Sequence, residues 1–255
     1  MDRETLASLV RRLFPRGGIL AFGSFGHGHG RSTLADEVFK ALKKAGTDTI
    51  RLSTGIVFRR IAESHGFSDL IQFSQYLEKN PSIAKEIDFY IDREVVQRLR
   101  EHKGNVVVLD SNLHVHPAIL RDVLGIYDFF TFYVHTPDNI LGKRLLAKSR
   151  EGERAYSSWI EAVQAQRKRT VLDIARYITY AGKVNDQTLR RIYNVGARIM
   201  ARLYLADVLF DDPLFLARLA KKLNRSTKIA IVDNSGSIEE SVNQIKDALS
   251  DEVRP

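Results

Sequence analysis

Residues 22–33 read Phe-Gly-Ser-Phe-Gly-His-Gly-His-Gly-Arg-Ser-Thr, and more can be inferred from this segment than from any other. It follows an apolar run over residues 18–22 and precedes an amphipathic run from Leu34 to Ala45. We therefore expect a strand, a glycine-rich turn and a helix, in that order. The backbone N–H groups of such a turn and the N-terminus of the helix together bind phosphate.

The end of this turn, Gly30-Arg31-Ser32-Thr33, matches the end of a P-loop, with an arginine in place of the usual lysine. The strict pattern also places a glycine where this chain has Phe25. The guanidinium group of arginine is wide and planar, whereas the ammonium group of lysine is a compact point charge. Three interpretations follow. The turn is a nucleotide site of unusual loop shape, or it belongs to a P-loop fold that has lost strong nucleotide binding, or it is a flexible turn without a ligand.

Length and composition favour one α/β domain, or one such domain with a lid, because the chain has 255 residues. No apolar run is long enough to span a bilayer, and the first residues do not resemble a secretory leader, so we expect no membrane partner. Cysteine is absent, which excludes disulfides and thiolate chemistry. The expected compartment is the cytoplasm.

The positive charge is concentrated in one segment. Residues 143–202 hold fourteen Lys or Arg and five Asp or Glu, whereas the whole chain has a net charge of +8. Such a segment indicates an anionic partner, either the phosphates of a nucleotide or the backbone of RNA. A solvated helical surface is the alternative.

Apolar runs alternate with helical patterns along most of the chain, which predicts a three-layer, doubly wound α/β fold with a parallel sheet of about five strands. Residues 150–225 interrupt this alternation with a long basic helical pattern, interpreted as a lid or insertion. The core then comprises residues 1–149 and 226–255. The expected strands are Ile19–Phe22, Thr49–Leu52, Asn105–Leu109, Phe129–Val134 and Lys228–Val232.

Polar residues follow the second and third expected strands, at the sheet edge where open α/β folds bind ligands. Ser53-Thr54-Gly55 comes directly after the second strand. Asp110 ends the third strand, where a P-loop protein carries the carboxylate behind the waters of Mg²⁺. The alternative for Asp110 is a cap on the following turn.

Several further segments fall into a recognisable order. They are Gly30-Arg31-Ser32-Thr33-Leu34-Ala35, Ser53-Thr54-Gly55-Ile56-Val57-Phe58-Arg59-Arg60, Phe73-Ser74-Gln75-Tyr76, Asn80-Pro81-Ser82-Ile83, Lys85-Glu86-Ile87-Asp88, Ile91-Asp92-Arg93 and Arg176-Tyr177-Ile178-Thr179-Tyr180. This set resembles cytidylate kinase, especially the archaeal type, within the P-loop nucleoside monophosphate kinases. The resemblance covers most of residues 18–182 and returns at 228–249, and it implies the fold of that family.

The resemblance also implies an activity: transfer of the ATP γ-phosphoryl group to CMP, dCMP or a related nucleotide, with Mg²⁺ as cofactor. The implied catalytic residues are Arg31, Asp110, Arg144 and Arg150. The implied nucleotide-binding residues are Gly26, His27, Gly28, His29, Gly30, Arg31, Ser32 and Thr33, and the implied metal residues are Ser32 and Asp110. The implied acceptor-binding residues are Ser53, Thr54, Gly55, Arg59, Asp92, Arg93 and Arg176.

Two other functions stay open. The altered loop favours a kinase-derived protein, weakly active or inactive, that binds RNA or a ribonucleoprotein through residues 143–202. Ile56, where the family has an acidic residue, favours a kinase for another small acceptor. His27 and His29 are expected to face phosphate or solvent rather than a metal ion. The sequence leaves the oligomeric state open.

Overall fold

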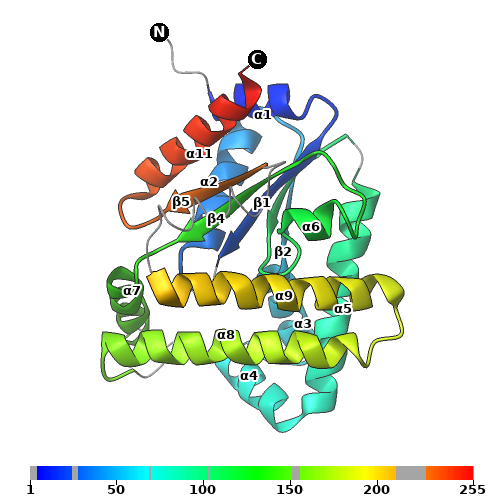
Figure 1. Ribbon diagram of the computed structural model, residues 1–255, viewed down its shortest axis with the longest axis vertical. Coiled ribbons are helices and arrows are strands. Elements are labelled where there is room, and N and C mark those ends of the chain that lie inside the picture. The colour runs from blue at the N-terminus through cyan, green and yellow to red at the C-terminus, as the bar shows by residue number, and fades with distance from the viewer. Residues whose placement is uncertain are drawn as a thin grey trace.

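A computed structural model describes residues 5–24, 28–68, 70–102, 104–150, 156–210 and 228–254. Its centre is a parallel five-stranded sheet in the order β2-β3-β1-β4-β5 (Figure 1). The strands are β1 (Gly18–Ser24), β2 (Thr49–Ser53), β3 (Val106–Asp110), β4 (Phe129–His135) and β5 (Ile229–Asp233). Each lies within a residue or two of its expected range, so the predicted α/β fold is confirmed.

Strand β1 lies in the middle of the sheet, with β3 on one side and β4 on the other. The chain leaves β1 for the edge strand β2, returns to β3, and crosses to β4. Ligands of open α/β sheets bind where the connections diverge in this way. The register places Phe22 of β1 and Ser53 of β2 opposite Asp110 of β3, so the carboxyl ends of three strands meet there.

Helices cover both faces of the sheet (Figure 1). On one face lie α1 (Leu6–Leu13), α2 (Arg31–Lys44) and α11 (Ile238–Val253), which share a buried apolar cluster with the strands. The other helices are α3 (Thr54–Ser64), α4 (Leu70–Lys79), α5 (Pro81–Glu101), α6 (Pro117–Leu120), α7 (Asp138–Arg150), α8 (Trp159–Ala181) and α9 (Gln187–Phe210). Among the described residues, no helix has the length and apolar character needed to cross a membrane.

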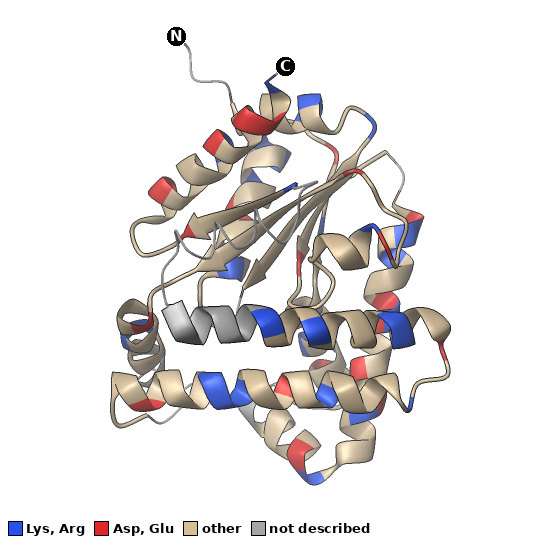
Figure 2. Cartoon of the chain, viewed as in Figure 1, with Lys and Arg blue, Asp and Glu red and all other residues tan. Residues whose placement is uncertain are grey.

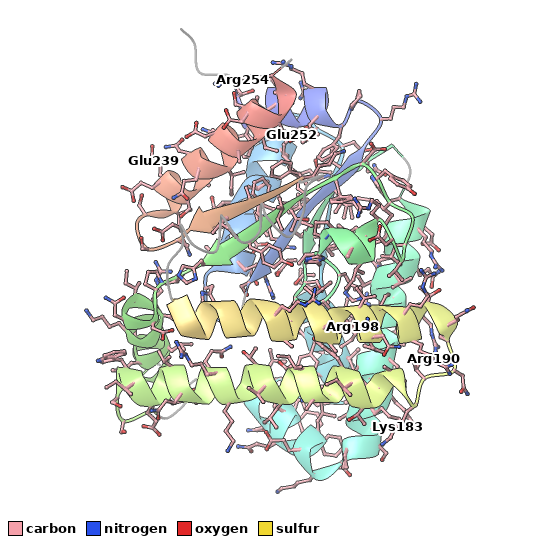
Figure 3. All side chains as sticks on the ribbon, in the orientation of Figure 1. Lys183, Arg190, Arg198, Glu239, Glu252 and Arg254 are labelled. Carbon is pink, nitrogen blue, oxygen red and sulfur yellow. The ribbon has the colours of Figure 1, made fainter. Side chains whose placement is uncertain are left out.

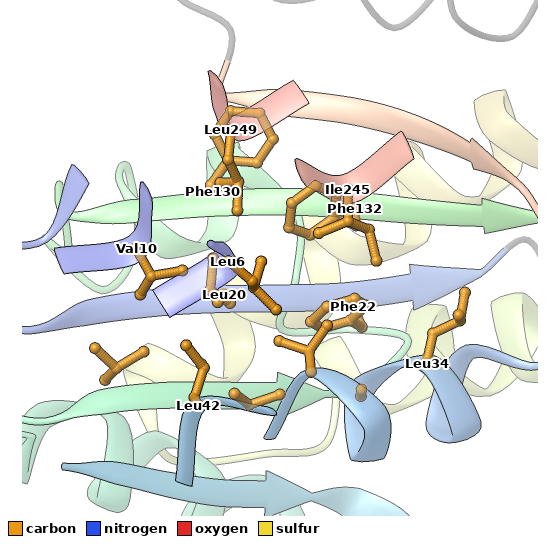
Figure 4. Close-up of a cluster of buried hydrophobic side chains, with 14 of the residues drawn as sticks. Leu6, Val10, Leu20, Phe22, Leu34, Leu42, Phe130, Phe132, Ile245 and Leu249 are labelled. Atoms are coloured by element: carbon orange, nitrogen blue, oxygen red, sulfur yellow. The ribbon is translucent and has the colours of Figure 1, made fainter. Parts of the chain in front are cut away.

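The core on the first face is built around aromatic rings from neighbouring strands (Figure 4). Phe22 of β1 stacks on Phe132 of β4 with ring centroids 5.2 Å apart, and Phe130 lies 5.0 Å from Phe132. Leu34 of α2 and Ile245 of α11 complete the layer and are fully buried. These strands are continuous apolar runs in the sequence because helices cover both faces of the sheet.

On the second face, α9 forms part of the packed core. Tyr193 and Ile192 are fully buried in a cluster with Leu113 and Ile119. A side chain at Gly196 would place its Cβ only 2.2 Å from Leu113, so this helical glycine permits the close approach. Helices α8 and α9 run alongside each other (Figure 1). The division of the chain at residue 150 stays a prediction.

The ring cluster yields a stability prediction. Phe132→Ala removes a fully buried ring that two others contact, and we expect a loss of about 3–5 kcal/mol in the free energy of unfolding, measured with urea. The control is Tyr127→Ala, because Tyr127 is 66% exposed and its removal should cost under about 0.5 kcal/mol. Equal losses in the two variants would contradict this account of the core.

Candidate functional site

The described part of the glycine-rich turn ends at an uncapped helix. Gly30 is the N-cap of α2, with φ of +81° and no side chain that caps the helix. A Cβ at this position would lie 2.2 Å from Nδ2 of Asn234, so only glycine fits without strain. The N–H groups of the first turn of a 14-residue helix are therefore left for a ligand, which is the geometry that binds anions.

His29 anchors this turn to the rest of the fold. Its ring is buried, and Nδ1 accepts a hydrogen bond of 3.0 Å from the backbone N–H of Thr136. Its carbonyl oxygen accepts from the Thr136 hydroxyl at 3.2 Å and from Nδ2 of Asn234 at 2.7 Å. The expectation that the His29 ring faces solvent is therefore wrong, because the ring is buried and binds the loop after β4. A contact of His29 with phosphate stays a prediction.

Asp110 is the centre of a buried ionic cluster at the carboxyl ends of β2 and β3. Its carboxylate forms an ion pair with Nε of Arg31 through Oδ1 and with Nη2 of Arg51 through Oδ2, the latter at 3.0 Å. The hydroxyl of Ser53 donates to Oδ2 at 3.1 Å, and Ser32 also donates to the carboxylate. The structure thus brings together Arg31, Ser32, Ser53 and Asp110, all of them predicted site residues.

Arg51 is the residue of this cluster that the sequence analysis missed. Its Nε donates to Asp36 at 2.8 Å and its Nη1 donates to the carbonyl of Leu52 at 3.0 Å, so every guanidinium nitrogen has an acceptor. The signal was present, since a charged residue between the apolar Ile50 and Leu52 of a strand needs a partner when it is buried. Asn112 is a further member, and its side-chain oxygen accepts from Nη1 of Arg31.

Two opposing effects act on the pKa of Asp110. Burial raises it, but the positive charges of Arg31 and Arg51 and the hydrogen bonds to the carboxylate outweigh burial. The net result is a pKa below the usual range, so the carboxylate is ionised at neutral pH.

The cluster also bears on the predicted magnesium site. A carboxylate that orients the waters of Mg²⁺ needs free acceptor positions and an uncompensated negative charge. Oδ2 of Asp110 accepts hydrogen bonds from Arg51 and Ser53, whereas Oδ1 forms an ion pair with Arg31 but has no hydrogen-bond partner among the described residues. The role of Ser32 and Asp110 at a magnesium ion stays a prediction.

Arg144 of α7 lies beside the turn, and its catalytic role stays a prediction. Its Nη1 is 4.0 Å from where a Cβ of Gly30 would be and 3.4 Å from the Thr136 hydroxyl. Thr33 is exposed on the first turn of α2. Gly26, His27 and the side chain of Arg150 lie outside the described residues.

The predicted acceptor residues divide into two groups. Ser53 is the N-cap of α3, with Thr54 and Gly55 in its first turn, and Arg59 is exposed one turn further along. The neighbouring Arg60 is held by the carboxylate of Glu94 at 2.6 Å. Arg59 therefore projects from a helix that begins at the Asp110 cluster, as an acceptor-binding residue would.

The second group ties α5 to α8 and α9. Asp92 accepts a 2.6 Å hydrogen bond from the Tyr193 hydroxyl. Arg176 pairs with Asp88 at 3.4 Å. Arg93 is exposed and lines a hollow at the start of α9. Asp92 also lies 3.6 Å from Nε2 of His114, in the segment after β3. An acceptor role for Asp92, Arg93 and Arg176 stays a prediction.

Part of the basic segment is engaged inside the fold. Arg167 pairs with Asp138, and Arg190 donates to the carbonyl of Val184 at 2.9 Å. Lysines and arginines are still spread along α8 and α9 (Figure 2), and Figure 3 shows Arg190 and Arg198 on α9. RNA binding through residues 143–202 stays a prediction.

Comparison with known proteins indicates which class of protein this chain is similar to. No protein-family profile matches the chain. The cytidylate kinase of Pyrobaculum islandicum is 29% identical over 160 residues, which are 62% of this chain and 73% of that protein. The cytidylate kinase of Pyrobaculum neutrophilum is 29% identical over 155 residues, covering 61% and 71%.

Among solved structures, a gluconokinase from Sinorhizobium meliloti is 14% identical, covers 93% of both chains and has a TM-score of 0.44. A putative kinase from Chloroflexus aurantiacus is also 14% identical, covers 57% of this chain and 74% of its own, and has a TM-score of 0.38. The cytidylate kinase relatives, together with the parallel sheet and the glycine-rich turn after β1, make the chain similar to P-loop kinases. More specifically, the chain is similar to the P-loop nucleoside monophosphate kinases.

The buried Asp92 yields a pH prediction. Burial raises its pKa to about 7 from 3.8, although the Tyr193 hydrogen bond opposes the shift. Between these values the folded chain holds a proton that the unfolded chain has lost, so this contribution to stability falls as pH rises through the window. We expect the stability of the wild type, measured with urea relative to Asp92→Asn, to decline from about pH 4 to pH 7.

The exposed Glu239 supplies the control, since Glu239→Gln should follow the wild type at every pH. His116, whose pKa burial lowers to about 4, is common to all three proteins and cancels in the comparison. Nε2 of His114 lies 3.6 Å from Oδ1 of Asp92, but burial lowers the pKa of His114 to about 4, so this group titrates only at the lower end of the window. A wild type and an Asp92→Asn variant that differ by the same amount at every pH would contradict the prediction.

Proposed function

We propose that this protein transfers the γ-phosphoryl group of ATP to a pyrimidine nucleoside monophosphate, with CMP or dCMP as the favoured acceptor. The observation that supports it best is the position of Arg31. This residue lies on the first turn of α2, directly after the anchored glycine turn, and reaches the carboxyl end of β3. The similarity to cytidylate kinases supports the choice of acceptor.

The donor phosphates would be held by backbone and side chains that act in different ways. The uncapped N–H groups of α2 and of the turn offer hydrogen bonds in a fixed direction, because His29 and Asn234 hold the turn in place. Arg31, which follows Gly30 in the chain, and Arg144, whose Nη1 is 4.0 Å from where a Cβ of Gly30 would be, offer positive charge. Phosphoryl transfer depends mainly on such positioning and charge neutralisation.

The acceptor would bind along α3. Ser53, Thr54 and Gly55 place the start of this helix next to the donor site, and the exposed Arg59 would hold the acceptor phosphate with its planar guanidinium. Magnesium ordinarily neutralises the phosphates in such reactions. Ser32 and Asp110 would hold this ion, which would add positive charge at the transferred phosphoryl group.

The activity is tested by measuring ADP production with a panel of nucleoside monophosphates. We expect CMP or dCMP to give the highest rate among them. Arg31→Ala should weaken ATP binding in calorimetry by about 1.5–3 kcal/mol, because it removes a charge-assisted contact. No ADP above background with any acceptor would overturn the proposed function, and equal ATP affinity in wild type and variant would remove Arg31 from the donor site.

Acceptor binding is tested with two adjacent arginines. Arg59→Ala should raise the KM for the acceptor and leave the KM for ATP nearly unchanged, since Arg59 lies on α3 rather than on the donor turn. The matched control is Arg60→Ala, because Arg60 is engaged with Glu94. If both variants shift the acceptor KM alike, or neither does, Arg59 has no special part in acceptor binding.

A further inference from the structure

We propose that His114 is a positioning residue at the end of β3, where it relays the protonation state of Asp92 to the hydroxyl of Ser111. The relay is a line of three side chains whose hydrogen bonds reverse when one proton is added. The relay itself goes beyond the proposed function, because it needs no nucleotide. Its effect on the reaction rests on the proposed function.

The line runs from the turn after β3 to α5 and α9. Oγ of Ser111 lies 3.0 Å from Nδ1 of His114, a hydrogen bond in which either atom can be the donor. Nε2 of His114 lies 3.6 Å from Oδ1 of Asp92, and Oδ2 of Asp92 accepts a 2.6 Å hydrogen bond from the Tyr193 hydroxyl. Ser111, His114 and Tyr193 are at most 1% exposed, so bulk water has little access to these contacts.

Nε2 of His114 is the unsatisfied atom of this line. It is buried and has no hydrogen-bond partner among the described residues. A buried polar atom without a partner is costly, and Oδ1 of Asp92 is the oxygen paired with it. Shortening the 3.6 Å gap to the usual hydrogen-bond length of about 2.7–3.2 Å completes the line.

Two groups of the line differ in how they hold a proton near neutral pH. Burial lowers the pKa of His114 to about 4, so its ring is neutral and carries one proton. Burial raises the pKa of Asp92 to about 7, so this carboxyl gains or loses its proton near neutrality. A change of pH around 7 therefore acts on Asp92 and leaves the charge of the His114 ring unchanged.

The other titratable groups that face Asp92 come from three helices. They are Tyr193 of α9, Tyr177 and Tyr180 of α8, and Asp88 one turn away on α5. Burial raises the pKa of each tyrosine well above its usual range, so all three keep their protons. Burial also raises the pKa of Asp88, which pairs with Arg176 and accepts from the Tyr180 hydroxyl. Asp88 therefore needs a control of its own.

One proton added to Asp92 reverses both hydrogen bonds of the His114 ring. When Asp92 is ionised, it accepts from Nε2–H, and Nδ1 accepts from the Ser111 hydroxyl. When Asp92 is protonated, its O–H donates to Nε2, the ring proton is on Nδ1, and Nδ1–H donates to Oγ of Ser111. The ring carries one proton in both states, because the hydrogen bond at one nitrogen decides which nitrogen is protonated.

This reversal changes how Ser111 holds the turn after β3. Its Oγ already accepts from the backbone N–H of Leu113 at 3.3 Å and of His114 at 3.4 Å. A hydroxyl oxygen accepts two hydrogen bonds, so a third donor at Nδ1 displaces one of them. Asn112 lies in this turn, and its side-chain oxygen accepts from Arg31. Protonation of Asp92 thus loosens the turn that Arg31 contacts.

The direct test is nitrogen-15 NMR of the histidine side chains, which distinguishes a protonated ring nitrogen from a bare one. We expect the proton of His114 to move from Nδ1 to Nε2 as the pH rises through about 7, with the ring neutral throughout. The variant His114→Gln identifies the signal. His116 is the internal control, because its Nδ1 accepts from the backbone N–H of Ala118 at 3.1 Å and its proton stays on Nε2.

Two results of this titration would overturn the proposal. One is a His114 ring that keeps its proton on the same nitrogen from about pH 5 to about pH 8. The other is a His114 ring that becomes charged as the pH falls through 7, because the added proton would then be on the ring and not on Asp92. The wild-type titration does not depend on the folding of any variant.

Two variants identify the group that controls the ring. Asp92→Asn removes the titrating carboxyl, so the protonated nitrogen of His114 should no longer change with pH. Asp88→Asn is the matched control, because Asp88 is another carboxylate of α5 that accepts from a tyrosine, and this variant should keep the change. A change that persists in Asp92→Asn, or that is lost only in Asp88→Asn, would overturn the proposal.

The positioning role is tested by the pH dependence of kcat with ATP and CMP. We expect kcat to rise through about pH 7 in the wild type and in Asp88→Asn, and the rise to be absent from Asp92→Asn. The same rise in all three proteins would overturn the positioning role of His114. No ADP production by the wild type at any pH would overturn the proposed function and the positioning role with it, and the NMR titration would still decide the relay.

Discussion

A single buried carboxylate constrains the carboxyl edge of the sheet. Asp110 ends a strand that is covered on both faces, and an unpaired charge there would cost several kcal/mol. Its partners come from the first turn of α2, from β2 and from the start of α3. Neutralising this carboxylate therefore holds in place three elements that a donor and an acceptor would contact.

A second set of constraints holds the glycine turn. The ring of His29 and the side chain of Asn234 bind the turn to the ends of β4 and β5, while Gly30 avoids a clash with Asn234. Arg144 reaches the same place from α7. The turn is thus pre-shaped by contacts made away from any ligand, which lowers the conformational entropy that binding would otherwise cost.

The helices after residue 150 show how a basic sequence can be partly structural. Tyr180 and Tyr193 donate hydrogen bonds to Asp88 and Asp92 on α5. These contacts and the buried face of α9 join the long helices to the core. A positive charge count over residues 143–202 cannot show which cations are engaged, because their acceptors lie as much as 88 residues away.

The sequence by itself determined the parallel sheet, the order of strand, turn and helix around residues 18–45, and the position of Asp110 at a strand end. Each of these follows from local patterns of apolar residues and glycine, which act over a few neighbouring positions. Only the tertiary structure decided that Arg51 neutralises Asp110 across 59 residues and that His29 faces inward. Such pairings depend on which strand ends meet and which loops cover them. The spacing of residues along the sequence shows neither.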